Sequence, residues 1–343
     1  MEIVAKAQAK ASLLLQQLGV SLVCPRPDPS LDVADIYSAL NYYVMISDRQ
    51  RMAAYQAGLG PFVAGKNCLE IGVGAHLPLM QMALAGDALH IHGVEVSPSA
   101  LQRAREVSAT FRKDWQARIT LHGCLSTKLE LESRADCLYH EIVGTVASDE
   151  GMIHCILDAQ ERLLSPGARI APEIVETLLV PVEEPPIGLA SSVVSRVAMG
   201  CPRLATDPGV QRLLNPSRSC WLSSAQTVER FDFRAGAPSL RDQARQEHEV
   251  VYQTSRDGSF SGFLASCRVE VGDGAKAIDA MHTRTNWGTY FIRMVEKPLR
   301  LPKGSKLTTR FCVDARPLEP SYSLFVELPS GQTADLRWGG IAA

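Results

Sequence analysis

The chain has 343 residues, of which 46% are apolar and 21% charged, and its net charge is −2. These globular values exclude extensive disorder, and the length suggests about two domains, each with its own core. The near-neutral charge, without a run of Lys and Arg, argues against a nucleic-acid partner, and no apolar run is long enough to span a membrane. The nine cysteines form no CxxC pair or Cys/His cluster, which indicates reduced thiols in a cytoplasmic protein and no metal site.

Residues 1–34 begin with an Ala-, Leu- and Lys-rich stretch. No basic region precedes this stretch, and glutamines interrupt its apolar part. The pattern therefore predicts an N-terminal helical segment and not a signal peptide.

Residues 35–175 alternate short apolar strands with helices. Ser97-Pro98 predicts a helix start, a second helix follows Glu150, and Pro166-Gly167 is expected to end it. The expected strands are Asn67–Ile71, Leu89–Val94, Ile119–His122 and Ala135–Glu141. This order predicts an α/β domain with a doubly wound, Rossmann-like parallel sheet.

The composition changes after about residue 173, and residues 176–343 are predicted to form a second domain. Segments rich in Val, Phe, Leu and Thr, separated by turn residues, predict an antiparallel sandwich or barrel. The expected strands lie in EIVETLLVPV, SGFLASCRVEV, TYFIRMVE, LTTRFCVDA and YSLFVEL. A less regular stretch at about 185–225 is too long for a simple loop and predicts a small inserted element.

A glycine turn follows the first expected strand, in CLEIGVGAHL. Gly72 and Gly74 allow a tight turn and a close approach to a ligand. Glu95, at the end of the next strand, is placed to accept both hydroxyl hydrogens of a ribose. Leu77 stands where a dinucleotide fingerprint has its third glycine, so the pattern favours a nucleoside such as S-adenosylmethionine. The alternative is a plain strand–turn–helix with a solvated Glu95.

Two carboxylates follow the fourth strand, in YHEIVGTVASDEG. Glu141 ends the strand, where open α/β sheets bind ligands, and Glu150 lies nine residues later. A loop of this length can direct both carboxylates into one site. The alternative is that Glu150 only complements a helix N-terminus.

A guanidino acceptor would explain the two carboxylates. A guanidinium has a pKa of about 13.8, so it arrives as a cation, as does the sulfonium of S-adenosylmethionine. Two such charges repel by about 4 kcal/mol at 4 Å and an effective dielectric constant of 20. Two carboxylates offset this repulsion and bind the planar fork through paired hydrogen bonds. Positioning and electrostatics then supply most of the catalysis.

Over about residues 35–343 the chain resembles the protein arginine methyltransferases. HEIVGTVASDE resembles the family's double-glutamate loop, and RTNWGTYF its Thr-His-Trp loop. NYYVMISDRQRMAAYQAGL resembles the family helix that carries Met45, Asp48, Arg51 and Tyr55 at fixed offsets. The resemblance implies that Arg51 binds the methionine carboxylate of the cofactor. It also implies a β-barrel in the second half and a dimerisation arm at about 185–225, and therefore a homodimer.

The resemblance assigns further residues by position. Tyr42 and Ser126 stand at cofactor-contacting positions, where the family has a histidine and an acidic residue. Asn286 replaces the central histidine of the Thr-His-Trp loop, beside Trp287. The implied acceptor-binding residues are Met45, Met152, Asn286 and Trp287. On the sequence alone, a core role is an equally good interpretation for the two methionines, and a buried barrel position for the tryptophan.

The resemblance leaves the acceptor open. The chain has little beyond the catalytic core and no broad acidic surface for basic tails, and Asn286 departs from the protein-modifying pattern. These features favour free L-arginine or a small derivative, methylated mainly once, with S-adenosylhomocysteine as co-product, as in bacterial natural-product biosynthesis. The alternatives are arginine in a protein, or a catalytically silent dimeric scaffold.

Overall fold

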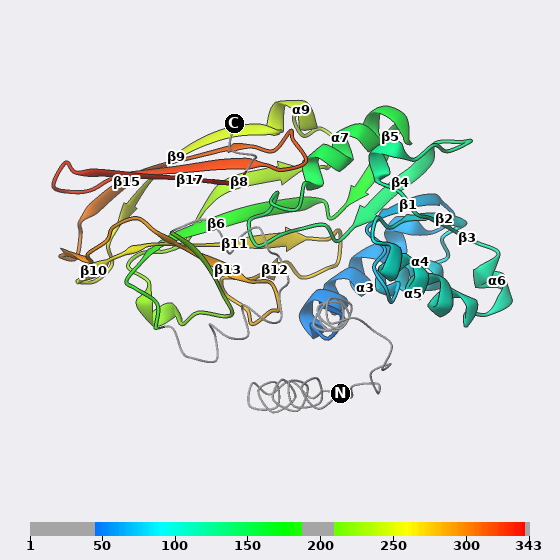
Figure 1. Cartoon of the computed structure of the whole chain (residues 1–343), viewed down its shortest axis with the longest axis horizontal. Coiled ribbons are helices and arrows are strands. Elements are labelled where there is room, and N and C mark those ends of the chain that lie inside the picture. Colours follow the sequence, from blue (N-terminus) through cyan, green and yellow to red (C-terminus); the bar gives the residue numbers. More distant parts are fainter. Residues whose placement is uncertain (1–44, 187–208, 340–343) are drawn as a thin grey trace.

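The computed structural model describes residues 45–186 and 209–339. The predicted N-terminal segment 1–34 therefore lies outside the described residues. A parallel sheet with its helices forms one end of the molecule, and long antiparallel strands form the other (Figure 1). The change from one kind of sheet to the other falls between Ala171 and Ile174.

The first sheet has five parallel strands in the order β3-β2-β1-β4-β5. These strands are β1 (Asn67–Ile71), β2 (His90–Val94), β3 (Ile119–His122), β4 (Ala135–His140) and β5 (Leu164–Ala171). Two of the four strands predicted from the sequence have the expected bounds, and the other two differ by one residue. The predicted α/β fold with a parallel sheet is confirmed.

One helix precedes the parallel strands, and the others connect them. They are α3 (Arg49–Val63), α4 (Pro78–Ala85), α5 (Pro98–Ala109), α6 (Lys113–Gln116), α7 (Met152–Arg162) and the 3-10 turn η1 (Ser126–Lys128). The helix start at Ser97-Pro98 is confirmed, because the Ser97 hydroxyl accepts from the Ala100 amide at 3.4 Å.

The predicted end of α7 at Pro166-Gly167 is wrong. The helix ends at Arg162, and the Pro-Gly pair lies within β5. There the pairing with β4 shifts register between Ala135 and Cys137. The physical reason is that proline has no N–H to donate to a strand ladder and Gly167 has a φ of +77°, so the pair forms an irregularity in a strand.

Antiparallel sheets make up the rest of the described chain. The strands expected from composition become β6 (Ile174–Val182), β11 (Gly262–Glu270), β13 (Thr289–Arg293), β15 (Lys306–Asp314) and β16 (Ser321–Glu327). They lie in two sheets, β7-β13-β11-β6-β8 with β12 beside β11, and β17-β16-β15-β9; β10 pairs with β14. The remaining elements are β7 (Val210–Leu213), η2 (Arg218–Cys220), β8 (Gln226–Asp232), α9 (Leu240–Gln243), β9 (Arg245–Gln253), β10 (Gly258–Phe260), β12 (Ile278–Asp279), β14 (Leu299–Leu301) and β17 (Thr333–Gly339).

The inserted element predicted at about 185–225 is wrong at its second end. Val210–Leu213 forms β7, which pairs with β13 as an edge strand of the larger antiparallel sheet. Residues 210–225 therefore belong to the sheet domain. The sequence does not reveal this strand, because a strand this short and polar is recognisable only once its partner is in place. Residues 187–208 lie outside the described part of the chain.

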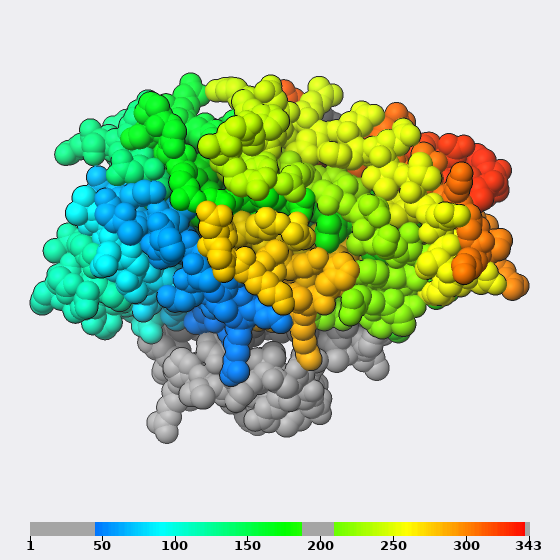
Figure 2. All heavy atoms as spheres, turned by 180° about the vertical axis from the view of Figure 1, so that it is seen from behind, coloured from blue at the N-terminus to red at the C-terminus, as the bar shows by residue number. Residues whose placement is uncertain are grey.

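One hydrophobic core is continuous through both parts. It includes Leu69 and Ile91 of the parallel sheet together with Phe263 and Phe311 of the antiparallel sheets, all fully buried. Seen from behind, the blue start of the described chain lies against the gold residues that precede β13 (Figure 2).

The described residues show neither a membrane-spanning helix nor a metal-binding cluster. None of their helices combines the length and the apolar character that a bilayer crossing requires. They contain no group of three His, Cys, Asp or Glu side chains arranged to hold a metal ion, and their cysteines are free thiols.

Candidate functional site

The glycine turn and Glu95 are in direct contact. Gly72 and Gly74 both have positive φ, +77° and +64°, which glycine adopts without steric cost. The Gly74 amide donates to Oε2 of Glu95 at 3.0 Å, and the Ser97 amide donates to Oε1 at 2.9 Å. Each carboxylate oxygen has two acceptor sites, so Glu95 keeps capacity for ligand hydroxyls. The structure thus places the predicted ribose-binding carboxylate against the predicted turn.

The position of the missing third glycine keeps the left-handed conformation. Leu77 has φ 54° and ψ 43° and is fully buried. A left-handed residue other than glycine costs roughly 1–2 kcal/mol, which the burial of the leucine side chain offsets. The departure from the glycine pattern therefore changes the residue and not the course of the turn.

Two exposed apolar side chains adjoin the predicted cofactor residues. Val96, next to Glu95, is 61% exposed, and Leu125, next to Ser126, is 38% exposed. Ser126 itself is buried at the start of η1. Exposed apolar side chains beside buried polar ones suit a flat apolar ring with polar edges. Sequence reasoning missed both, although each is adjacent to a residue that it selected. Tyr42 lies outside the described residues.

One face of α3 is bound to the loops that carry the site. Asp48 caps the helix by accepting from the Arg51 amide at 3.2 Å, and its second oxygen accepts from the Asn286 amide at 2.7 Å. The Tyr55 hydroxyl donates to the His140 carbonyl at 3.0 Å. Residues at these offsets share a helix face, so α3 joins the end of β4 to the Asn286–Trp287 loop.

Arg51 is the centre of these contacts. Its side chain is 2% exposed, Nη1 lies 2.8 Å from Oε1 of Glu141, and the guanidinium stacks over the Trp287 ring at 3.7 Å. The Trp287 indole donates to the Val143 carbonyl at 2.9 Å. The buried Nε of Arg51 has no hydrogen-bond partner in the described part of the chain. A ligand carboxylate would satisfy this donor, so the arrangement fits the role that the resemblance implies.

The two predicted glutamates share one electrostatic environment. Burial raises the pKa of Glu141 to about 7, against the lowering effect of Arg51, and the charge of Glu150 raises it further. Neighbouring protein atoms also raise the pKa of Glu150, while Arg212 and Arg51 lower it. The Glu150 side chain is nevertheless exposed, so solvent weakens this upward shift. The charge of Glu150 therefore acts on Glu141, and Arg51 acts on both; a shared acceptor site for the two carboxylates stays a prediction.

The alternative interpretation of Glu150 is not supported. Helix α7 begins at Met152 with Gly151 as its N-cap, and its first turn contains no acidic residue. Glu150 thus lies before the cap and outside the first turn, where a carboxylate complements the helix dipole. Its position leaves it available to a ligand.

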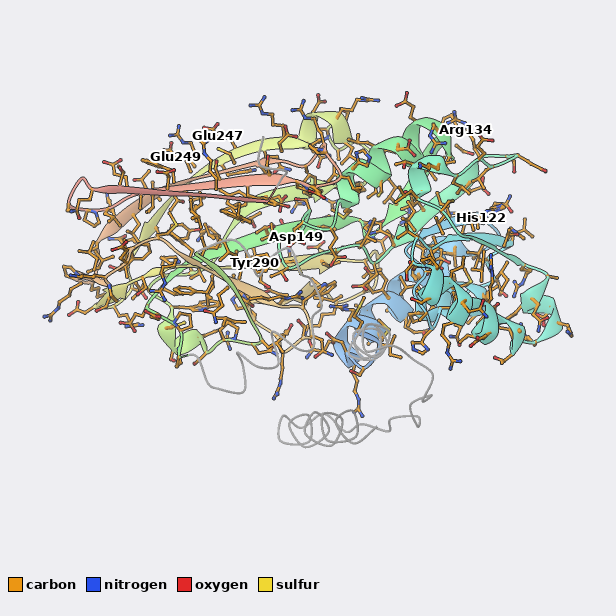
Figure 3. All side chains as sticks on the ribbon, in the orientation of Figure 1. His122, Arg134, Asp149, Glu247, Glu249 and Tyr290 are labelled. Carbon is orange, nitrogen blue, oxygen red and sulfur yellow. The ribbon has the colours of Figure 1, made fainter. Side chains whose placement is uncertain are left out.

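A third carboxylate, Asp149, adjoins Glu150. The Tyr290 hydroxyl donates to its Oδ2 at 2.8 Å, and Figure 3 labels the two residues beside each other. Burial and the charge of Glu150 raise the pKa of Asp149 to about 7, against the Tyr290 hydrogen bond and Arg212. Arg212 of β7 pairs in register with Tyr290. Asp149, Tyr290 and Arg212 were not identified from the sequence. Of these three, only Asp149 could have been found from the sequence, because it is next to Glu150.

The comparisons with known proteins concern both sequence and structure. No known protein-family profile matches the chain. The chain is 27% identical over 176 residues to "Probable protein arginine N-methyltransferase 6" of Arabidopsis thaliana, covering 50% of this chain and 40% of that protein. It is 27% identical over 154 residues to "Protein arginine N-methyltransferase 6" of Danio rerio, covering 44% and 43%. The chain thus spans less than half the length of these relatives.

Solved structures match over a larger part of the chain. The Trypanosoma brucei PRMT1 enzyme-prozyme heterotetrameric complex with AdoHcy has a TM-score of 0.69 at 16% identity, covering 87% of this chain and 97% of that one. Arabidopsis thaliana protein arginine methyltransferase 10 has a TM-score of 0.65 at 16% identity, covering 89% and 98%. The chain has the protein arginine methyltransferase fold. A parallel-sheet domain followed by an antiparallel-sheet domain, as the resemblance implied, is therefore confirmed.

Within this fold, the four implied acceptor-binding residues have different surroundings. Met152 and Trp287 belong to the hydrophobic core, at 0% and 4% exposure. Met45 is partly exposed, and the Asn286 side chain lies 3.4 Å from the Ser47 hydroxyl. The buried position of Met152 fits a core packing role. The ring of Trp287 packs against the Arg51 guanidinium and does not face an open cavity in the described part of the chain. Acceptor contact by these four residues stays a prediction.

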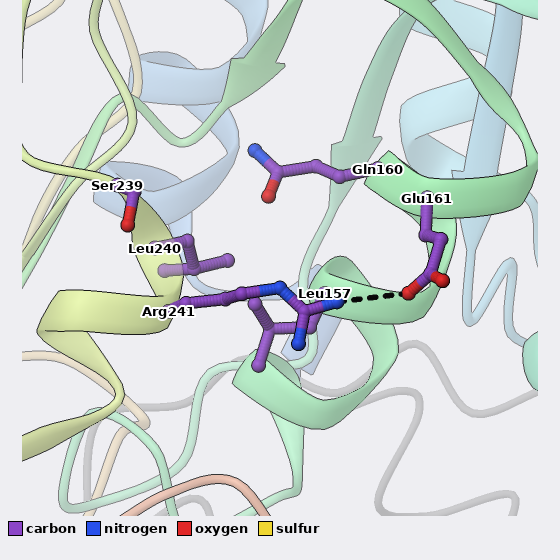
Figure 4. A pocket seen from close by; sticks show the side chains of 6 residues that line it. All are labelled: Leu157, Gln160, Glu161, Ser239, Leu240 and Arg241. Carbon is purple, nitrogen blue, oxygen red and sulfur yellow. Dashed lines mark hydrogen bonds and ion pairs between the residues drawn. The ribbon is translucent and has the colours of Figure 1, made fainter.

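A cavity of about 300 Å³ lies apart from these residues, between α7 and α9 (Figure 4). An exposed ion pair borders it, with Arg241 Nη2 2.9 Å from Oε2 of Glu161. None of the predicted site residues lines the cavity, which is formed by Leu157, Gln160, Glu161, Ser239, Leu240 and Arg241.

Proposed function

We propose that this chain is an S-adenosylmethionine-dependent N-methyltransferase that acts on the guanidino group of arginine. One observation carries the proposal: the buried Arg51 pairs with Glu141 at 2.8 Å at the end of β4, and the loop that follows Glu141 ends at Glu150, immediately before the Gly151 cap of α7. Two adjacent carboxylates suit a planar cation. The fold, and relatives whose names describe arginine methyltransferases, support the same activity.

The cofactor would be held at the ends of β1 and β2. Arg51 would bind its carboxylate, Glu95 its ribose hydroxyls, and Val96 and Leu125 would flank its base beside Ser126. When bound, the cofactor supplies a methyl group on a cationic sulfur. The turn at Gly72 and Gly74 gives the backbone the close approach that such a ligand needs.

The acceptor would be held by the two glutamates. An ionised Glu141 and Glu150 bind the guanidinium nitrogens, offset its charge and orient the remaining nitrogen. A carboxylate whose pKa lies near 7 is ionised only above that pH, so the acceptor cation itself favours the ionised form when it binds.

Two acceptor classes are supported by different observations. The names of the relatives support arginine in a polypeptide. Arg212 supports the free L-arginine expected from the sequence: it lies near Asp149 and Glu150, yet it forms no ion pair within 4.0 Å in the described part of the chain. A guanidinium in that setting suits the α-carboxylate of a free amino acid. Polypeptide arginine is the better supported class.

Mass spectrometry tests the proposal directly. The chain is incubated with S-adenosylmethionine and either free L-arginine or a Gly-Arg-rich peptide, with the Glu150→Gln variant as control. Methylated peptide at a far higher kcat/KM than free arginine supports the polypeptide class. A higher kcat/KM for free arginine than for the peptide, with that preference lost in Arg212→Met, supports the free L-arginine class. Methylation of neither acceptor contradicts the proposed function.

The proposed assembly is a cytoplasmic homodimer. The T. brucei neighbour is a heterotetrameric complex, which supports oligomerisation in proteins of this fold. Sedimentation of the intact chain tests the proposal, and a monomer at micromolar concentration would contradict it.

A further inference from the structure

A buried carboxylate outside the predicted site contacts the double-glutamate loop. Glu229 lies on β8 with 0% exposure, and both of its oxygens accept hydrogen bonds. One donor is the hydroxyl of Ser148, two residues before Glu150, and the other is the hydroxyl of Thr177, its register partner on β6. The antiparallel domain thus contacts the loop through a buried carboxyl group.

The two hydroxyls connect Glu229 to consecutive residues of the loop. Thr177 Oγ1 accepts from the Ala147 amide at 2.9 Å, and the hydroxyls of Ser148 and Tyr322 are 2.8 Å apart. An ionised carboxylate only accepts, so Ser148 and Thr177 donate to Glu229, and Tyr322 donates to Ser148. Every hydroxyl in the network then has a consistent role, and the backbone of the loop is held from β6, β8 and β16.

A buried glutamate at position 229 would destabilise the fold if its only role were packing. It has no ion-pair partner among the described residues, and burial raises its pKa to about 7, against the two hydroxyl hydrogen bonds. Glu176, beside Thr177 on β6, is equally sheltered but contacts both Arg230 and Arg268. A buried carboxylate without a cation is costly to the fold. Its hydrogen bonds to the loop are the contribution that offsets this cost.

We propose that Glu229 is a positioning residue of the reaction, which holds Ala147 and Ser148 so that Glu150 keeps its place beside Glu141. The proposal rests on the proposed function, because it concerns the same two glutamates. Glu229 touches neither ligand in this role. It acts through the course of the loop, and its removal should affect turnover more than cofactor binding.

The test compares Glu229→Gln with the parent enzyme and with Glu176→Gln. Ser148 and Thr177 donate to different oxygens of Glu229, and a glutamine replaces one of these acceptors with an NH2 donor, so one of the two hydroxyl hydrogen bonds is lost in this geometry. We expect Glu229→Gln to lower kcat at least tenfold and to keep the Kd for S-adenosylhomocysteine within twofold, measured by calorimetry. Glu176→Gln should lower the Tm and leave kcat within twofold.

Coupling to Glu150 separates positioning from a general structural effect. In a Glu150→Gln background, Glu229→Gln should lower the residual kcat less than threefold, because both changes disable the same group. Equal losses in both backgrounds, or a kcat for Glu229→Gln within twofold of the parent, would overturn the proposal.

Hydrogen exchange gives a readout that does not depend on activity. Mass spectrometry of a peptide covering 141–151 should show faster exchange of the Ala147 amide in Glu229→Gln and in Ser148→Ala, but not in Glu176→Gln. Unchanged exchange in both loop variants contradicts the positioning role. If exchange responds and no arginine substrate is methylated, the proposed function fails and the role of Glu229 in the loop stands. Ser148→Ala also serves if Glu229→Gln does not fold.

Discussion

Arg51 and Glu141 form a buried ion pair across two elements that are far apart in the sequence. Nη1 and Oε1 are 2.8 Å apart, and the side chains are 2% and 11% exposed. The proposed function gives these residues different ligands, the cofactor carboxylate for Arg51 and the acceptor guanidinium for Glu141. The pair therefore holds both groups in place before either ligand binds, and Arg51 favours the ionised form of Glu141.

Replacing Arg51 with Met should weaken both cofactor binding and stability. The change leaves Glu141 buried without its cation, which costs about 3 kcal/mol when the carboxylate is ionised. We expect a larger loss of unfolding free energy at pH 8 than at pH 6, and at least a tenfold weaker affinity for S-adenosylhomocysteine. Calorimetry and denaturant unfolding measure these effects. Arg103→Met, in an exposed pair with Glu106, is the control and should change neither.

Replacing Glu141 or Glu150 with Gln should lower kcat at least about a hundredfold, because each change keeps the shape and removes a charge from the acceptor site. Cofactor affinity should be largely kept in Glu150→Gln. The matched control is Glu161→Gln, which breaks the exposed pair with Arg241 beside the α7–α9 cavity. Near-normal turnover in either site variant would refute the charge-neutralising role.

Replacing Glu95 with Ala should weaken S-adenosylhomocysteine binding by at least about 1 kcal/mol, because two ribose contacts are lost. The Gly74 and Ser97 amides also lose their acceptor, so the turn should exchange its amide hydrogens faster. Unchanged affinity in calorimetry would rule out the ribose assignment.

The kcat/KM for the acceptor should fall as the pH drops below about 7. Burial raises the pKa values of Glu141 and Asp149 to about 7, and the acceptor guanidinium stays charged throughout this range. A protonated carboxylate does not neutralise it, so kcat/KM should fall about tenfold per pH unit for one group and more steeply for two. Rates from pH 5.5 to 9 measure the profile, and a flat profile between pH 6 and 8 would contradict it.

Glu229 should make the fold less stable as pH rises. Burial raises its pKa from 4.5 to about 7, so the folded chain retains a proton that the unfolded chain has released. This contribution is fully present below pH 4.5 and is lost as pH rises through about 7, with a total of about 3 kcal/mol. Glu229→Gln lacks the effect. Its stability relative to the parent should therefore rise between pH 4.5 and pH 8 in urea unfolding, and a constant difference would contradict the assignment.

The local features of this protein were predictable from its sequence. Alternation of apolar strands with capped helices predicted the observed bounds of β1 and β3, and those of β2 and β4 to within one residue, because main-chain propensities and caps act over a few residues. Gly72, Gly74 and Glu95 were identified in the same way, since a turn and the strand end beside it follow local rules. The resemblance located Glu141, Glu150 and Arg51 from short motifs.

Only the tertiary structure determined which side chains meet. Glu229 lies in the charged stretch VERFD, where no local pattern distinguishes it from a solvated residue, and its hydrogen bond to Ser148 joins residues 81 positions apart. Arg212 likewise became relevant only once β7 paired with β13. Strands such as β9, with one polar face towards solvent, carry too little apolar signal to be found alone. Such contacts depend on sheet packing, which brings distant segments together and which short-range sequence patterns do not encode.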